Sequence, residues 1–235
     1  MDFSAFSGPA FWAALLSIIV ANILLSGDNA VVIALASRNL PPAQQKKAIF
    51  WGSAAAIILR VVLTITAVQL LTLPYLKIIG AILLLYIGVQ LLADSSEEED
   101  MHAHPNIWGA IRTILVADLV MSLDNVLAVA AAAQKGPEET RLVLLIIGLG
   151  LSIPLIIFGS ALLLKVMDRF PIIITLGAGL LGLLAGGMLV EDPAIKESMQ
   201  AAFEDAHMIF EGIGVAIVLL VGTYLKKKQK NKEAA

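Results

Sequence analysis

Apolar residues occur along this chain in seven long blocks that are separated by short polar segments. Each block is near or above the length of about 20 residues that a helix needs to cross a bilayer. Blocks of this length favour membrane-spanning helices over short strands. The pattern therefore predicts an all-α membrane protein with spans at about residues 10–36, 48–72, 75–93, 107–133, 142–164, 171–190 and 208–225.

The composition supports this prediction and narrows the function. Of the 235 residues, 59% are hydrophobic and 15% charged, and the longest predicted loop covers only residues 191–207. Loops this short leave no room for a soluble catalytic or nucleotide-binding domain, and the chain has no Walker-type phosphate loop. We therefore expect a protein that is not an enzyme, with no prosthetic group and no nucleic-acid partner. We expect the protein to lie in the lipid bilayer. The sequence leaves open whether it forms a homo-oligomer.

Glycines in the sixth block have the spacing of a dinucleotide-binding fingerprint, at Gly177, Gly179 and Gly182. No strand precedes them, and Gly186 extends the series at a four-residue interval. Small residues spaced in this way allow membrane helices to approach closely. The pattern predicts tight helix packing rather than nucleotide binding.

Basic residues predict the orientation in the membrane. With the N-terminus outside, eleven of them fall on the cytoplasmic side, including a basic tail at residues 226–235, against four outside. Arg60 is left within the second span. Because the first 37 residues contain no Lys or Arg, they do not resemble a signal peptide, and we expect the first span to stay in the mature protein.

One motif occurs twice, 96 residues apart. Ser26-Gly27-Asp28-Asn29 in the first span is matched by Ser122-Leu123-Asp124-Asn125 in the fourth. Three spans in each copy would place the copies in the membrane with opposite orientations. We therefore predict a single domain made of inverted repeats at residues 10–93 and 107–190, followed by a seventh helix at 208–225. Local helix breaks at Ser26-Gly27 and at Ser122-Leu123 would bring the polar residues of each copy together.

The polar residues of the two motifs provide oxygen atoms that could bind a cation. Three aspartates in hydrocarbon cost roughly 7–10 kcal/mol to insert, a cost that a divalent cation would offset. The chain has no cysteine, and no histidine in a span, so oxygen donors favour Mn²⁺, Ca²⁺ or Mg²⁺ over copper or zinc. An aspartate could instead cap a helix or pair with Arg60. The candidate metal ligands are Asp28, Asp118, Asp124, Asn22, Asn29, Asn125, Ser26 and Ser122.

An acidic loop with two histidines covers residues 94–104. It faces the cytoplasm in the predicted topology and could gather cations near an entrance, or it could be only a solvated acidic loop. A second acidic set, at residues 191–211, has no assigned role.

The two Asp-Asn motifs, the seven blocks and the length resemble the TerC family of integral membrane proteins, and residues 28–36 are most similar to its short bacterial YjbE-type branch. The resemblance covers roughly residues 10–225. It implies manganese efflux and metal homeostasis at the bacterial inner membrane. The family's acidic residue six places before the motif aspartate corresponds to Asp118 in the second copy, whereas the first copy has Asn22.

The sequence therefore predicts a secondary transporter that exports a divalent cation, Mn²⁺ first among them, in exchange for protons. Two other functions stay open. An accessory of membrane insertion or secretion would need no transport of its own. An intramembrane aspartyl protease would also place carboxylates on neighbouring spans, but such sites resemble Gly-x-Gly-Asp, whereas this chain has Leu25-Ser-Gly-Asp28.

Overall fold

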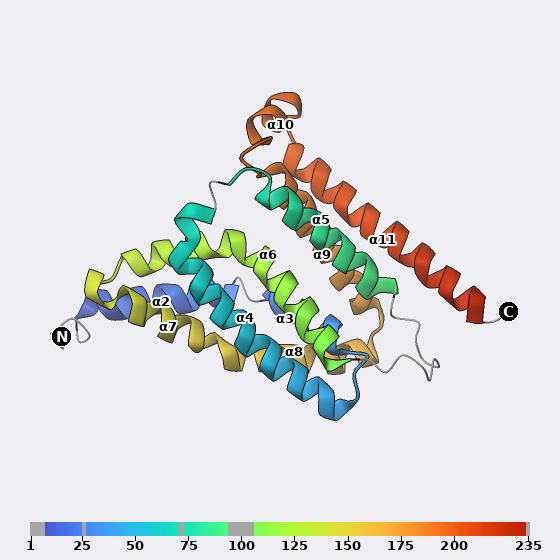
Figure 1. Ribbon diagram of the computed structural model, residues 1–235, viewed down its shortest axis with the longest axis horizontal. Helices are drawn as coiled ribbons and strands as arrows, with labels where there is room; N and C mark the ends of the chain where they lie inside the picture. Colours follow the sequence, from blue (N-terminus) through green and yellow to red (C-terminus); the bar gives the residue numbers. More distant parts are fainter. Residues whose placement is uncertain (1–7, 25–26, 71–72, 94–105, 234–235) are drawn as a thin grey trace.

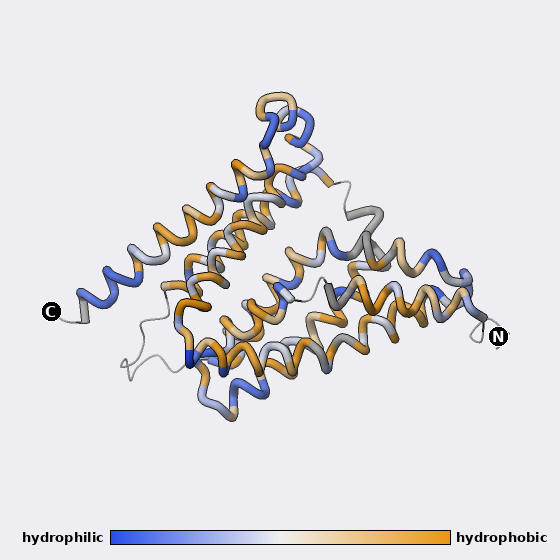
Figure 2. The backbone as a smooth tube through the Cα atoms, turned by 180° about the vertical axis from the view of Figure 1, so that it is seen from behind, coloured by the Kyte–Doolittle hydropathy of each residue, from blue (hydrophilic) through white to orange (hydrophobic). Residues whose placement is uncertain are grey.

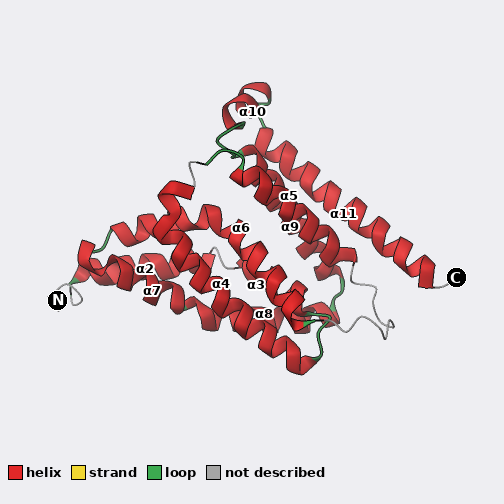
Figure 3. Ribbon diagram, in the orientation of Figure 1, coloured by secondary structure: helices red, strands yellow, loops and turns green. Residues whose placement is uncertain are grey.

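The computed structural model describes residues 8–24, 27–70, 73–93 and 106–233, and within these ranges every regular element is a helix (Figure 1, Figure 3). In chain order the helices are α2 (Pro9–Leu24), α3 (Gly27–Ser37), α4 (Pro42–Leu70), α5 (Leu76–Ala93), α6 (Ile107–Gln134), η2 (Glu138–Thr140), α7 (Arg141–Gly150), α8 (Ser152–Arg169), α9 (Ile172–Val190), α10 (Lys196–Ala202) and α11 (Ala206–Glu233).

Four of the described helices are long and apolar enough to cross a membrane. They contain Pro42–Thr64, Leu76–Ala93, Ile172–Val190 and Ala206–Asn231, and shorter apolar helices cover Pro9–Ala21 and Gly27–Ser37. Hydrophilic residues gather at α10 and at the C-terminal end of α11 (Figure 2). Large apolar side chains such as Trp51, Trp108 and Phe158 are exposed, as expected of helices that contact lipid.

Local sequence explains several helix ends. Pro42 starts α4, where its missing N–H costs no hydrogen bond. The side chain of Asn106 accepts a hydrogen bond of 3.0 Å from the N–H of Trp108 and so caps α6. The tail predicted at residues 226–235 continues α11 as helix to Glu233.

Helix breaks differ between the two copies of the motif. In the first copy, α2 ends at Leu24 and α3 begins at Gly27, on either side of the predicted break, while Ser26 lies outside the described residues. In the second copy the predicted break at Ser122-Leu123 is wrong, because α6 runs without interruption through both residues. This copy has no glycine at the position, and Leu123 is buried in the core.

The block predicted at residues 142–164 contains a break that the hydrophobic pattern did not indicate. α7 ends at Gly150 and α8 begins at Ser152. Pro154 explains the position, because it cannot donate a hydrogen bond to the carbonyl of Gly150 and its ring crowds the preceding turn.

The helices form two groups (Figure 1). In one group α5, α9 and α11 pack against one another, and in the other α4 packs on α6, α3 on α8, and α2 on both α6 and α7. The groups meet where α5 contacts α6 and where α3 contacts α9.

Glycines permit the closest contacts between helices. A Cβ atom at Gly182 of α9 would collide with the carbonyl oxygen of Gly214 in α11, and one at Gly186 would collide with that of Phe210. This confirms that the glycine spacing in the sixth block serves tight helix packing.

Two further close contacts have related positions in the sequence. A Cβ atom at Gly52 of α4 would lie 2.8 Å from Cδ1 of Ile114 in α6, and one at Gly148 of α7 would lie 3.1 Å from Cβ of Ile18 in α2. Gly148 follows Gly52 by 96 residues, and Ile114 follows Ile18 by the same interval. The two contacts therefore involve equivalent positions with the copies exchanged.

Candidate functional site

The first Asp-Asn motif lies at the start of α3. Asp28 is in the first turn of that helix, and its Oδ1 atom accepts a hydrogen bond of 2.8 Å from the N–H of Asn29. A carboxylate here is stabilised by the positive end of the helix dipole. Asp28 is half-buried, whereas Asn29 is buried.

The second motif lies in the middle of α6. Ser122 and Asn125 are buried there, and Asp118 is buried one turn before Ser122. Asp124 belongs to the same helix, but its side chain lies outside what the structure describes. The same holds for the side chain of Asn22 on α2, for Ser26 and for the acidic loop at residues 94–104.

One cavity joins the two motifs. It has a volume of about 100 Å³ and is lined by residues of four helices: Asp28 of α3, Leu84 of α5, Met121 and Asn125 of α6, and Leu184 and Met188 of α9. Asp28 and Asn125 come from different copies of the motif and are 97 positions apart in the sequence. The fold therefore brings together one polar residue from each copy at a single cavity.

Asp118 does not line this cavity but belongs to a buried ion pair. Its Oδ1 atom accepts a hydrogen bond from the guanidinium of Arg60 in α4, and its Oδ2 atom accepts one of 3.2 Å from the Ser122 hydroxyl. Arg60 Nε in turn donates to Ser122 Oγ at 2.9 Å. The side chains of Arg60 and Asp118 are 1% and 6% exposed, so nearly all of both charges is withdrawn from solvent. The pairing of an aspartate with Arg60, left open by the sequence, is realised by Asp118.

The ion pair has no counterpart at the corresponding positions of the other copy of the motif. The position 96 residues after Arg60 is occupied by Ile156, which is buried, and the position 96 residues before Asp118 is occupied by Asn22. The first copy thus lacks the acid, and the second copy lacks the arginine.

Two residues of the cavity that carry a donor atom in the side chain were not among the predicted ligands. Met121 and Met188 were missed because soft donors were sought only among cysteine and histidine. A signal was present for Met121, which precedes Asn125 by four residues and so lies on the same face of α6. No spacing in the sequence relates Met188 to either motif.

One member of the acidic set at residues 191–211, Asp192, has a structural role. This buried carboxylate accepts backbone hydrogen bonds from Tyr75, Lys77, Ile78 and Ala194 at 2.9–3.2 Å. Burial alone would raise the pKa of Asp192, but these four hydrogen bonds together hold the pKa below its ordinary value. Asp192 therefore joins the end of α9 to the start of α5, where Tyr75 adopts a positive φ of 67°.

Glu191, beside it, binds two basic side chains. It lies 2.9 Å from Nζ of Lys77 and 3.3 Å from Nε2 of His207. Burial of the Glu191 carboxylate opposes ionisation, but Lys77 and His207 outweigh it and lower the pKa. Among the described residues, no group of three or more acidic or histidine side chains is arranged to hold a metal ion.

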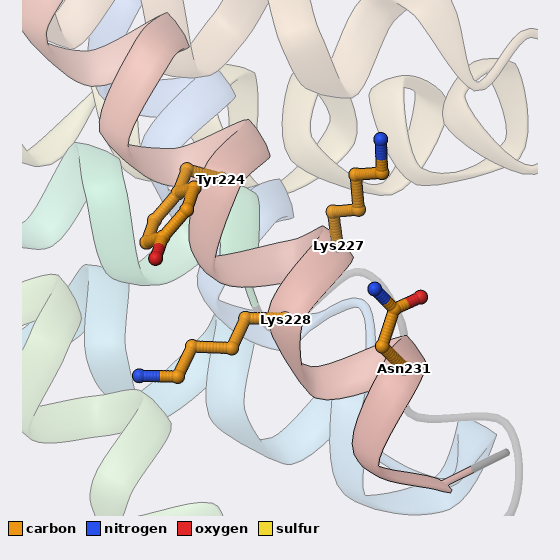
Figure 4. Close-up of a pocket in the computed structure, with 4 residues that line it drawn as sticks. All are labelled: Tyr224, Lys227, Lys228 and Asn231. Carbon is orange, nitrogen blue, oxygen red and sulfur yellow. The ribbon is translucent and has the colours of Figure 1, made fainter. Parts of the chain in front are cut away.

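A larger hollow of about 510 Å³ lies on α11, lined by Tyr224, Lys227, Lys228 and Asn231 (Figure 4). Its lining carries two positive charges and no carboxylate, so it does not suit a cation. Lysines at such a position attract an anionic membrane surface. The smaller cavity beside Asp28 is therefore the candidate cation site.

Comparison with known proteins places these observations in a family. The family model for the integral membrane protein TerC family matches residues 7–230. The membrane protein YjbE of Bacillus subtilis is 41% identical over 216 residues, which cover 92% of this chain and 96% of that protein. YceF of Bacillus subtilis is 26% identical, and the match covers 96% of this chain and 87% of YceF. The UPF0053 inner membrane protein YoaE of Escherichia coli is 25% identical over 78% of this chain and 38% of YoaE. No solved structure matches.

Proposed function

Because this chain belongs to the TerC family of integral membrane proteins, we propose that it is a secondary transporter that exports a divalent metal cation, with Mn²⁺ as the substrate and protons as the counter-ion. The observation that carries this proposal is the cavity where Asp28 and Asn125 meet. A transporter made of inverted repeats binds its ion between the copies, near the middle of the membrane.

Charge balance supports a divalent substrate. The spans that carry the motif hold three carboxylates, at Asp28, Asp118 and Asp124, and Arg60 neutralises Asp118. Two other carboxylates are then left in the two spans that carry the motif, which matches the charge of one divalent cation. A cation at this position would offset the cost of burying the two carboxylates.

The repeat itself stays a proposal, and two observations support it. The exchanged contacts of Gly52 with Ile114 and of Gly148 with Ile18 are those that two inverted copies would make. The helix ends differ between the copies, since α2 ends at Leu24 and α3 begins at Gly27 in one, whereas the break lies at Leu151 in the other. This difference fits copies that hold different conformations in one state of the transport cycle.

Energy for export would come from a counter-ion. Moving a divalent cation outward against an inside-negative potential costs roughly 4.6 kcal/mol per 100 mV, twice the cost for a single charge. Two protons moving inward would cancel this charge movement. We propose the bacterial inner membrane as the location, with the N-terminus outside and the C-terminus in the cytoplasm.

Flux in proteoliposomes that contain only this protein tests the function. We expect Mn²⁺ uptake or release that depends on the protein and is accelerated by an opposing proton gradient. Asp28→Asn keeps the size and one oxygen but removes a charge, so it should abolish flux. Asp205→Asn, the same change at an exposed position, should leave flux unchanged.

The alternatives give different outcomes in that experiment. An accessory of insertion or secretion machinery would show no metal flux in vesicles of the purified parent protein. A protease would show none either and would cleave a membrane peptide, with loss of cleavage in Asp28→Asn. Parent-like Mn²⁺ flux in Asp28→Asn would exclude the cavity as the transport site.

The proposed topology has its own test. Because the chain contains no cysteine, single cysteines at residue 2 and at residue 230 report on opposite ends without background. We expect an impermeant thiol reagent to label the first in intact cells and the second only after the membrane is opened. The reverse pattern would contradict the orientation.

A further inference from the structure

Two methionine side chains form part of the wall of the cavity beside Asp28. Met121 of α6 and Met188 of α9 are 8% and 5% exposed, and both line the cavity together with Asp28 and Asn125. A thioether sulfur is a soft, polarisable donor, unlike the oxygen atoms of a carboxylate or an amide. The wall therefore mixes two kinds of metal ligand.

The composition of this wall disfavours cations that accept only oxygen. Of its six residues, two carry side-chain oxygen atoms, two carry sulfur, and Leu84 and Leu184 carry neither. Ca²⁺ takes six to eight oxygen ligands, and Mg²⁺ requires a nearly ideal octahedron of them. Only two of the six lining side chains can supply oxygen, so Ca²⁺ or Mg²⁺ at this site would have to take most of its ligands from water.

A glycine gives Met188 its place. A Cβ atom at Gly80 of α5 would lie 2.8 Å from Cε and 3.4 Å from Sδ of Met188, and 2.8 Å from Cγ1 of Val120. The missing side chain at residue 80 thus leaves the space that the thioether occupies. Met121 reaches the same cavity one helical turn before Asn125, which places a sulfur and an amide oxygen on one face of α6.

We propose that Met121 and Met188 are thioether ligands that make the cavity selective for transition-metal cations over Ca²⁺ and Mg²⁺. This inference rests on the proposed function and narrows its substrate class. Methionine also fills irregular spaces in protein cores, and that role makes a different prediction. A space-filling methionine can be replaced by leucine at a cost below about 1.5 kcal/mol with no change in metal preference.

Metal binding by purified leucine variants tests the inference. Titration calorimetry of Cd²⁺, Mn²⁺ and Ca²⁺ would be compared for the parent, Met121→Leu, Met188→Leu and the double variant. The matched control is Met167→Leu, since Met167 is a buried methionine of α8 that does not line the cavity. We expect the double variant to lose Cd²⁺ affinity by about tenfold or more, the order of loss seen when partners of metal ligands are removed. The loss should be smaller for Mn²⁺ and absent for Ca²⁺, and the control should match the parent for all three ions.

A spectroscopic measurement on the unmutated sequence does not depend on how the variants fold. Protein labelled with selenomethionine and loaded with Cd²⁺ should show cadmium as a direct neighbour of selenium in X-ray absorption at the selenium edge. Gly80→Ala, which displaces Met188 without removing it, should weaken that signal.

The outcomes separate the inference from the function on which it rests. If the parent binds Mn²⁺ and the double variant keeps the parent's ratio of Cd²⁺ to Ca²⁺ affinity, or if no cadmium neighbour is seen, the thioether role is wrong and the transporter stands. If the parent binds and transports no divalent cation, the proposed function fails and this inference fails with it.

Discussion

Asp28 and Asp118 are both aspartates of the repeated unit, but their surroundings differ. Asp118 lies in the middle of a continuous helix, where Arg60 and Ser122 occupy both of its oxygen atoms. Asp28 lies at the first turn of a helix and lines a cavity shared with Asn125. The two carboxylates differ in how their charge is compensated: Asp118 is paired within the protein, whereas Asp28 faces a cavity that could hold a ligand. We expect the first to govern stability and the second to govern binding.

The largest expected change in stability comes from breaking the ion pair. Arg60→Leu would leave the Asp118 carboxylate buried without its partner, which costs about 3–5 kcal/mol of unfolding free energy. Adding Asp118→Leu should recover most of this loss, because no unpaired charge then remains. Thermal unfolding in detergent without metal is the measurement, with Asp28→Asn as the comparison. A melting temperature of Arg60→Leu equal to that of the parent would show that the pair is not the stabilising element.

A smaller loss is expected at Asp192, another carboxylate whose two oxygen atoms both accept hydrogen bonds from the protein. Asp192→Asn removes the charge that four backbone N–H groups share, and charge-assisted hydrogen bonds contribute about 1.5–3 kcal/mol. Because folding lowers the pKa of this carboxyl, its contribution is complete above the ordinary pKa and is lost as the pH falls through the lowered value.

Unfolding of the parent and of Asp192→Asn between pH 7 and pH 3 checks this prediction. The difference between the two curves should begin to narrow at the acid end of this range. A difference that grows as the pH falls would contradict the assignment, since the sign of the effect would then be reversed.

The smallest expected effect comes from making the first copy like the second. Asn22→Asp adds a carboxylate to the first copy, and the residue of the second copy that corresponds to Arg60 is Ile156, so nothing in the repeat pattern compensates the new charge. We expect the variant to fold, and to bind Mn²⁺ more tightly by up to about tenfold, or about 1.4 kcal/mol, or to release it with a changed pH dependence. Adding Ile156→Arg should return the affinity to that of the parent. Equal Mn²⁺ affinity and equal pH dependence in the parent and Asn22→Asp would show that a charge at residue 22 does not act on the metal site.

Much of this architecture follows from the sequence, because membrane helices are determined by the length of apolar runs. The start of α6 is an example, since both the apolar run and the cap at Asn106 mark it. The family and the glycine contacts of α9 with α11 are likewise carried by short motifs. The proposed repeat would account for the lining of one cavity by both Asp28 and Asn125.

The remaining features depend on contacts between distant segments. The Arg60–Asp118 pair joins residues 58 positions apart, and the sequence offered Arg60 several aspartates as partners. Met188 reaches the cavity only because Gly80 of another helix leaves space for it. The break at Leu151 had a local signal in Gly150 and Pro154, but the unbroken hydrophobicity of residues 142–164 concealed it.

The buried ion pair also constrains how the protein is made. Arg60 leaves the ribosome before Asp118, and at about 5–20 residues per second the 58 residues between them take roughly 3 to 12 seconds to synthesise. During this interval α4 carries Arg60 without its partner, and an unpaired arginine costs about 2.5–3.5 kcal/mol for entering the bilayer. A nascent chain arrested at residue 106 should therefore insert α4 less efficiently than one arrested beyond residue 134. On this expectation, the arrival of Asp118 from the second half of the chain stabilises a helix of the first half, which makes the order of synthesis part of the assembly pathway.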